Sequence, residues 1–187
     1  MQRHAAGDTV DYTITYLEMT ARPTYARPHL FGREPSALVH SITPPVWYFL
    51  SLYDAVGRNY AWDDAHELSP EDLSAFVGDD AVALYTFLRN GWPHGFFMLD
   101  TRALPICNVS YLGLVPEAIG QGLGTWLLQT AVHMAWDIHG VDKVTLNTCT
   151  LDHPRALANY QRNGFIPVRQ ETKSRTLLRD WDPATFP

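Results

Sequence analysis

An alternation of apolar and polar residues is the first regular pattern along the chain, and it covers residues 10–19. Its apolar members are aromatic or β-branched, which is typical of a strand. They are Val10, Tyr12, Ile14 and Tyr16. The next stretch, 21–45, contains five prolines and is longer than a plain connection. We expect it to lack long helices and to cover a site.

Two helices are predicted in the following part of the chain. Apolar positions within 46–56 fall near one helical face, with a proline pair before them and a glycine after them. A second helix begins after Ser69, because Ser69, Pro70 and Asp72 form the pattern of an N-cap with a first-turn proline. Gly78 is expected to end this helix.

Strands and helices then alternate to the end of the chain. Segments 81–88 and 95–99 are predicted strands that meet across Asn90-Gly91, a strong hairpin signal. Trp92-Pro93 favours a loop longer than two residues. The other predicted strands are 106–115, 143–148, 165–168 and 174–178, and the other predicted helices are 123–138 and 154–163. The expected order, β-α-α-β-β-β-α-β-α-β-β, is typical of a mixed α/β domain.

Composition limits the class of protein. The chain has 187 residues, of which 46% are apolar and 18% are charged, so one folded domain covering 1–187 is expected. The net charge of −6 and the isoelectric point of about 5.7 argue against a nucleic acid as the main partner. A mildly acidic surface remains compatible with cationic substrates.

Cysteine usage and the spread of apolar residues bear on location. Cys107 and Cys149 are too few for a disulfide scaffold, which favours a reduced compartment. The first residues, with Arg3 and Asp8, are too polar for a signal peptide. No apolar window reaches the roughly 18 residues that a membrane helix needs. We expect a cytoplasmic protein without a membrane span, and the histidines have no metal-ligand spacing, so no metal is expected.

The clearest chemistry lies in the glycine-rich stretch 119–125, between a predicted strand and a predicted helix. Its alternating glycines leave backbone N–H groups uncovered, and the helix N-terminus behind them carries a partial positive charge. Together they predict a site for a phosphate or pyrophosphate. The spacing fits neither the dinucleotide motif Gly-x-Gly-x-x-Gly nor the P-loop, which requires a lysine.

Two motifs resemble those of one acetyltransferase superfamily. Residues 112–128, Leu-Gly-Leu-Val-Pro-Glu-Ala-Ile-Gly-Gln-Gly-Leu-Gly-Thr-Trp-Leu-Leu, resemble motif A of the GNAT superfamily. Residues 156–165, Ala-Leu-Ala-Asn-Tyr-Gln-Arg-Asn-Gly-Phe, resemble its motif B, with Asn159 in place of the usual leucine. A predicted strand lies between the two motifs, as it does in that superfamily.

The resemblance implies a single-domain α/β GNAT-like fold, in which helices flank a mixed central sheet with splayed parallel strands. Acetyl-CoA would be the co-substrate, bound by a core at about 106–168, and about 21–68 would form the acceptor side. The pantetheine arm would pair with the backbone of Leu112, Gly113 and Leu114. The pyrophosphate would lie on the loop formed by Gly120, Gln121, Gly122, Leu123, Gly124 and Thr125.

The resemblance also assigns catalytic positions. Tyr160 stands at the family's general acid, which protonates the departing CoA thiolate. His153 stands where the family commonly has an asparagine, and two interpretations stay open: hydrogen bonding or proton transfer near the thioester, or a plain helix start. The usual glutamate positions hold Asn108 and Thr148, so the general base is not identified. Cys149 is interpreted as a small buried thiol, because the superfamily forms no covalent enzyme intermediate.

The sequence therefore predicts an acetyl-CoA-dependent N-acetyltransferase that acts on an amine, with a small molecule slightly favoured over a protein, and leaves a homodimer open. Tyr60 and Trp62, beside Asp63 and Asp64, are candidates for holding a cationic amine. The alternative is a catalytically silent acyl-CoA-binding regulatory module on the same fold, motivated by the missing glutamates. An ordinary nucleotide-binding protein is disfavoured by the glycine spacing.

Overall fold

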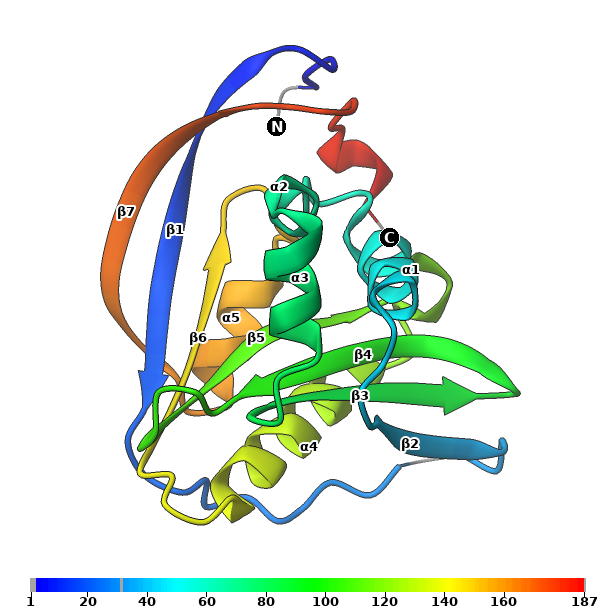
Figure 1. Cartoon of the computed structure of the whole chain (residues 1–187), viewed down its shortest axis with the longest axis vertical. Helices are drawn as coiled ribbons and strands as arrows, with labels where there is room; N and C mark the ends of the chain where they lie inside the picture. Colours follow the sequence, from blue (N-terminus) through cyan, green and yellow to red (C-terminus); the bar gives the residue numbers. More distant parts are fainter. Residues whose placement is uncertain (1–2, 31, 187) are drawn as a thin grey trace.

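One mixed sheet organises the molecule. The computed structural model describes residues 3–30 and 32–186, and within them seven strands lie in the order β2-β3-β4-β5-β6-β1-β7 (Figure 1). The strands are β1 (Thr9–Met19), β2 (Ser36–Ser41), β3 (Val82–Arg89), β4 (Trp92–Asp100), β5 (Ile106–Leu114), β6 (Lys143–Cys149) and β7 (Ile166–Thr176). Each neighbouring pair is antiparallel except β5 and β6, which are parallel.

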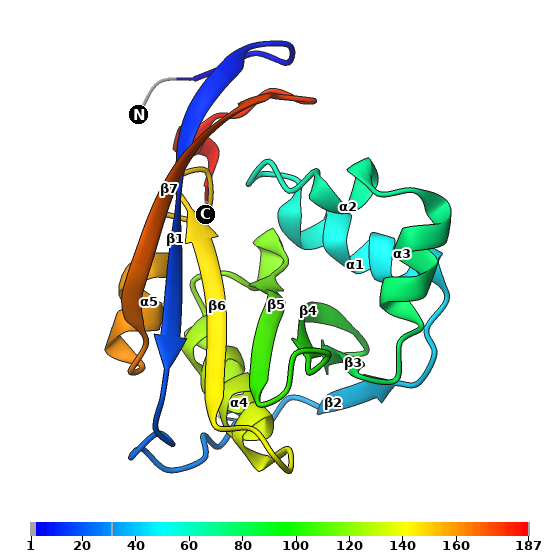
Figure 2. The ribbon, with the colours of Figure 1, turned by 60° about the vertical axis from the view of Figure 1, so that its left-hand side comes forward.

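Helices cover both faces of this sheet (Figure 2). On one side lie α1 (Val46–Gly57), α2 (Asp64–Glu67) and α3 (Pro70–Val77), and on the other lie α4 (Leu123–Asp137) and α5 (Ala156–Arg162). Two short 3-10 turns are η1 (Pro116–Ala118) and η2 (Pro183–Thr185). The predicted start of α3 is confirmed, since the Ser69 hydroxyl accepts a hydrogen bond of 3.0 Å from the Asp72 N–H. The mixed α/β architecture is confirmed with it.

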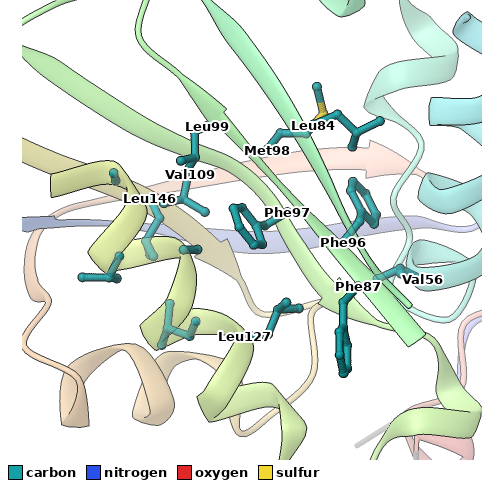
Figure 3. Packing of buried hydrophobic residues seen from close by; sticks show 14 of the residues in the cluster. Val56, Leu84, Phe87, Phe96, Phe97, Met98, Leu99, Val109, Leu127 and Leu146 are labelled. Atoms are coloured by element: carbon teal, nitrogen blue, oxygen red, sulfur yellow. The ribbon is translucent and has the colours of Figure 1, made fainter. Parts of the chain in front are cut away.

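The core lies on both sides of the central strand β4. Phe96, Phe97, Met98 and Leu99 are all fully buried, because helices cover the sheet at this point on both faces (Figure 3). Successive side chains of a strand point to opposite faces. The Phe96 ring lies 6.3 Å from that of Phe49 in α1, whereas the ring of Phe87 in β3 lies 4.6 Å from that of Trp126 in α4.

The hairpin between β3 and β4 is tighter than its sequence suggested. Asn90 and Gly91 alone form the turn, with φ of 54° and 85°, and the expectation of a longer loop is wrong. Trp92 and Pro93 belong to β4. The strand register shifts between Phe87 and Leu88, and this irregularity accommodates a proline that has no N–H to donate.

None of the described residues of the proline-rich stretch 21–45 lines the cleft described below, so the expectation that this stretch covers a site is wrong for that cleft. Its first half packs against the far end of α4, where Arg22 and Arg27 pair with Asp137. Its second half contains β2, an edge strand paired with β3 that the sequence pattern did not reveal. The prolines fall outside this strand.

Two other elements differ from expectation. Segments 165–168 and 174–178 were predicted as separate closing strands, but one strand, β7, runs through from Ile166 to Thr176. It is continuous because β1 pairs with it along nearly its whole length. The short helix α2 was not predicted, and four residues are too few to show a helical period.

Candidate functional site

A cleft opens where β5 and β6 separate. The parallel pairing covers three residue pairs and ends at Asn108 and Thr145, after which the two strands diverge (Figure 2). Near this point β5 also contains an extra residue, Ser110, because Tyr111 pairs with Met98 and Val109 with Leu99. The cleft has a volume of about 890 Å³ and is lined by β5, the glycine loop, α4, the end of β6, α5 and the segment after α1.

The glycine loop forms one end of this cleft. Gly120 and Gly122 adopt φ of 82° and 73°, a conformation that L side chains rarely adopt. Gly122 is the N-cap of α4 and offers no side-chain acceptor to the first turn, which also lacks acidic residues. The first N–H groups of α4 therefore have no partner within the helix, and they face the cleft with the positive end of the helix dipole.

Two other glycines of this region differ in what a side chain would meet. A Cβ at Gly113 would lie 2.4 Å from Cγ1 of Val56, so only glycine lets α1 approach β5. A Cβ at Gly124 would meet only Cδ1 of Leu114, at an ordinary 3.8 Å. No protein atom therefore excludes a side chain at position 124, and a side chain there would occupy part of the cleft.

Every residue expected to bind acetyl-CoA, except Gln121, lines this cleft: Leu112, Gly113, Leu114, Gly120, Gly122, Leu123, Gly124 and Thr125. The Gln121 side chain instead donates to the carbonyl of Glu117, at 3.2 Å. Asn159, the departure from motif B, accepts a hydrogen bond of 2.9 Å from the Thr125 hydroxyl. The contact between α5 and the first turn of α4 is therefore polar.

Tyr160 projects from α5 into the cleft. Burial, and after it the negative charge of Asp152, raise the pKa of Tyr160 above its ordinary value. The phenol therefore stays protonated at neutral pH and can donate a proton.

His153 lies at the border of the cleft, ahead of α5. Its Nδ1 accepts a hydrogen bond of 3.1 Å from the Arg155 N–H, and its ring lies 6.1 Å from that of Tyr60. Helix α5 begins only at Ala156, so His153 and Asp152 are not in its first turn. The structure brings His153 and Tyr160 into one cleft.

The two positions of the missing glutamates are engaged in hydrogen bonds. The Asn108 amide donates to the Ser110 hydroxyl at 3.0 Å and accepts from the Thr145 hydroxyl at 3.1 Å. The Thr148 hydroxyl donates to Oδ2 of Asp152 at 2.8 Å. Neither side chain can accept a proton at neutral pH.

Asp152 is the residue that sequence reasoning missed. Its Oδ2 also accepts from the Cys149 N–H at 2.9 Å, and its Oδ1 accepts from Trp62 Nε1 at 3.0 Å. Burial raises the pKa of this carboxyl, although the hydrogen bonds oppose the rise. The sequence signal was a carboxylate beside the family's asparagine position, and it was interpreted as part of a helix start.

Aromatic rings and one carboxylate form the opposite wall. Trp62 and Tyr111, with ring centroids 5.7 Å apart, both line the cleft. The Asp64 carboxylate, also part of the lining, accepts from the hydroxyls of Tyr53 and Tyr111 at 2.6 and 2.7 Å. This wall has the ring faces and negative charge that suit a cation.

Three neighbouring side chains are less able to bind a cation or to react: Asp63, Tyr60 and Cys149. Asp63 is fully buried and lies 3.6 and 3.3 Å from the guanidinium groups of Arg175 and Arg179, which neutralise it. The Tyr60 hydroxyl is buried, and burial raises its pKa to about 12. Burial raises the pKa of Cys149 to about 12 as well, which keeps that thiol protonated.

Within residues 3–30 and 32–186, no cluster of three His, Cys, Asp or Glu side chains is arranged to hold a metal ion. The helices of the same residues are all too short or too polar to cross a membrane.

Comparison with known proteins identifies one family and several structures that this chain resembles. The model of the acetyltransferase (GNAT) family matches residues 47–165. A GCN5-related N-acetyltransferase from Kribbella flavida has a similar fold, with a TM-score of 0.57 and 16% identity over 87% of this chain and 56% of that chain. One from Sphaerobacter thermophilus gives a TM-score of 0.56 and 16% identity over 96% of this chain and 54% of that one.

An aminoglycoside acetyltransferase from an uncultured soil metagenomic sample gives a TM-score of 0.50 and 15% identity over 68% of this chain and 86% of its own. At such identities the structures show likeness of fold alone. The chain spans between 54% and 65% of the length of four solved structures that it resembles. No curated protein sequence matches it.

Proposed function

Because the chain belongs to the GNAT acetyltransferase family, we propose that it transfers the acetyl group of acetyl-CoA directly to the nitrogen of an amine. One observation carries this proposal: the strands β5 and β6 separate beside a glycine loop and an uncapped helix N-terminus. That arrangement joins an opening in the sheet to a set of backbone donors for a diphosphate.

The residues of the cleft fit this co-substrate. The N–H groups from Gly120 to Thr125 would bind its pyrophosphate, and the edge of β5 at 112–114, which faces away from β4, would pair with its amide groups. Arg155 and Arg162 add positive charge to the cleft on the α5 side. When bound, acetyl-CoA supplies an acetyl group activated as a thioester.

The roles proposed for this chain's own groups follow from their places in the cleft. The Tyr160 hydroxyl keeps its proton at neutral pH and would give it to the leaving sulfur. His153, at the border of the same cleft, would donate a hydrogen bond near the thioester.

The acceptor is proposed to be a small-molecule amine. The wall formed by Trp62, Tyr111 and Asp64 offers ring faces and a carboxylate within a cleft, which suits a compact cation better than an extended peptide. The aminoglycoside acetyltransferase with a similar fold is compatible with this choice. A silent acyl-CoA-binding module is the second candidate, favoured by the engagement of Asn108 and Thr148 in hydrogen bonds.

Two measurements test the proposal. CoA should raise the melting temperature of the protein, whereas NAD and ATP should not. Thiol release from acetyl-CoA is then followed with a panel of simple amines, polyamines, aminoglycosides and peptides. Release that depends on an amine supports the enzyme, a CoA shift without release from any amine supports the silent module, and the absence of a CoA shift refutes both.

A further inference from the structure

We propose that Asp152 is the catalytic residue that holds the ammonium group of the acceptor and takes its proton. This inference rests on the proposed function and names the group that neither Asn108 nor Thr148 can supply. The proton moves from the ammonium nitrogen to the carboxylate of Asp152. The nitrogen lone pair is then free to react, and the proton passes to solvent after turnover.

The first support is the position of the carboxylate. Asp152 follows the end of β6, on one side of the opening between β5 and β6, and lines the same cleft as Tyr160. Its charge also contributes to the raised pKa values of Tyr160, Tyr60 and Cys149, so it lies within electrostatic reach of all three. A group at this place can reach both the acceptor and the proposed acid.

The second support is its hydrogen bonding. Oδ2 accepts hydrogen bonds from the Thr148 hydroxyl and from the backbone N–H of Cys149, and Oδ1 accepts one from Trp62. The Cys149 thiol, a weak donor, also hydrogen-bonds to the carboxyl. Together these donors fix the orientation of the carboxylate beside the cleft that it lines.

The third support is the charge around it. Among the described residues no Lys, Arg or His forms an ion pair with Asp152, and its donors are all neutral. Asp152 is half-buried, and a carboxylate withdrawn from water ordinarily has a cationic partner. Asp63 has two such partners, Arg175 and Arg179. An ammonium ion from the substrate would supply the missing charge.

A separate observation, on Tyr60, also indicates that a ligand binds beside Asp152. Tyr60 is only 6% exposed and lines the cleft, and its hydroxyl has no hydrogen-bond partner among the described residues. A buried hydroxyl without a partner is unfavourable unless a ligand provides one. Four groups thus face Asp152: Tyr60 and Trp62 after α1, Cys149 at the end of β6, and Tyr160 on α5. The charged or titratable residues that follow Asp152 in sequence are His153 and Arg155.

The main test compares Asp152→Asn with the wild type, and with Asp54→Asn as the matched control at an exposed carboxylate bonded to His66. At neutral pH we expect kcat/KM of Asp152→Asn to fall by ~10²–10⁴-fold, the range of general base catalysis, with an unchanged CoA thermal shift. Its residual rate should rise about tenfold per pH unit with the fraction of neutral amine, while the wild type levels off.

A further variant keeps the carboxylate and removes one donor. Thr148→Val should raise the pKa of Asp152, because it removes a hydrogen bond to the charged form. The acid limb of the pH profile should then move to higher pH, while the rate on the plateau is retained. A purely structural role would lower the rate at every pH and leave the limb in place.

A readout without turnover completes the test. With aspartate carboxyl carbons labelled by ¹³C, the NMR titration of the CoA complex should show one carboxyl with a raised pKa, absent in Asp152→Asn and equal to the pKa of the acid limb. An Asp152→Asn rate within threefold of the wild type and an unmoved pH profile would overturn this inference alone. A wild type that lacks both the CoA shift and turnover would overturn the proposed function, and this inference with it.

Discussion

Replacing Tyr160 by phenylalanine isolates the proposed acid, because the change removes one hydroxyl and keeps the ring. The ring packs at the foot of the cleft, with its centroid 6.3 Å from that of Phe165, and phenylalanine preserves this contact. The causes of the raised pKa of Tyr160 are burial and the charge of Asp152, with no hydrogen bond among them. Losing the hydroxyl should therefore change the free energy of unfolding by less than ~1 kcal/mol.

The effect on the rate should be much larger. A general acid contributes ~10²–10⁴-fold, which corresponds to about 2.7–5.4 kcal/mol in the activation barrier. The assay measures kcat by thiol release with the best amine of the panel, together with the CoA thermal shift and the denaturant midpoint. A kcat within about threefold of the wild type, with CoA affinity retained, would show that Tyr160 is structural, and His153 would be the next residue to replace.

Three other predictions follow from the same structure. Gly122→Val should abolish the CoA thermal shift, because its φ of 73° does not suit a β-branched residue, whereas Gln121→Ala should change the shift little; equal effects would contradict the backbone cradle. Ser69→Ala should lower the free energy of unfolding by about 1 kcal/mol, because α3 loses its N-cap, and Ser51→Ala serves as the control inside a helix. Equal denaturant midpoints for these two variants would refute this prediction. Burial raises the pKa values of Cys107 and Cys149 to about 12, so the unfolded chain loses these thiol protons at lower pH than the folded chain. The free energy of unfolding should therefore fall from about pH 9 toward pH 12, by ~1.4 kcal/mol per pH unit and thiol. In urea titrations the Cys107→Ala, Cys149→Ala double variant should show a shallower decline, and an equal slope would count against this prediction.

Local signals predicted most of the elements. The N-cap at Ser69, the turn at Asn90-Gly91 and the apolar period from Leu123 each depend on residues close together in sequence, and each was confirmed. The family prediction was confirmed as well, because its two motifs are short and contiguous. The failures share a cause: β2 and the uninterrupted β7 exist through pairing with distant strands, which no local pattern encodes.

The candidate site divides in the same way. The sequence by itself determined the glycine loop, since positive φ and uncovered N–H groups follow from residue type, and it determined the presence of Tyr160 on the helix that follows. Only the tertiary structure decided what Asp152 faces, because its partner Trp62 lies 90 residues earlier and reaches it across the cleft. Burial, and the lack of a cationic partner among the residues that the structure describes, are properties of that assembled cleft, and they give an ordinary aspartate its proposed role.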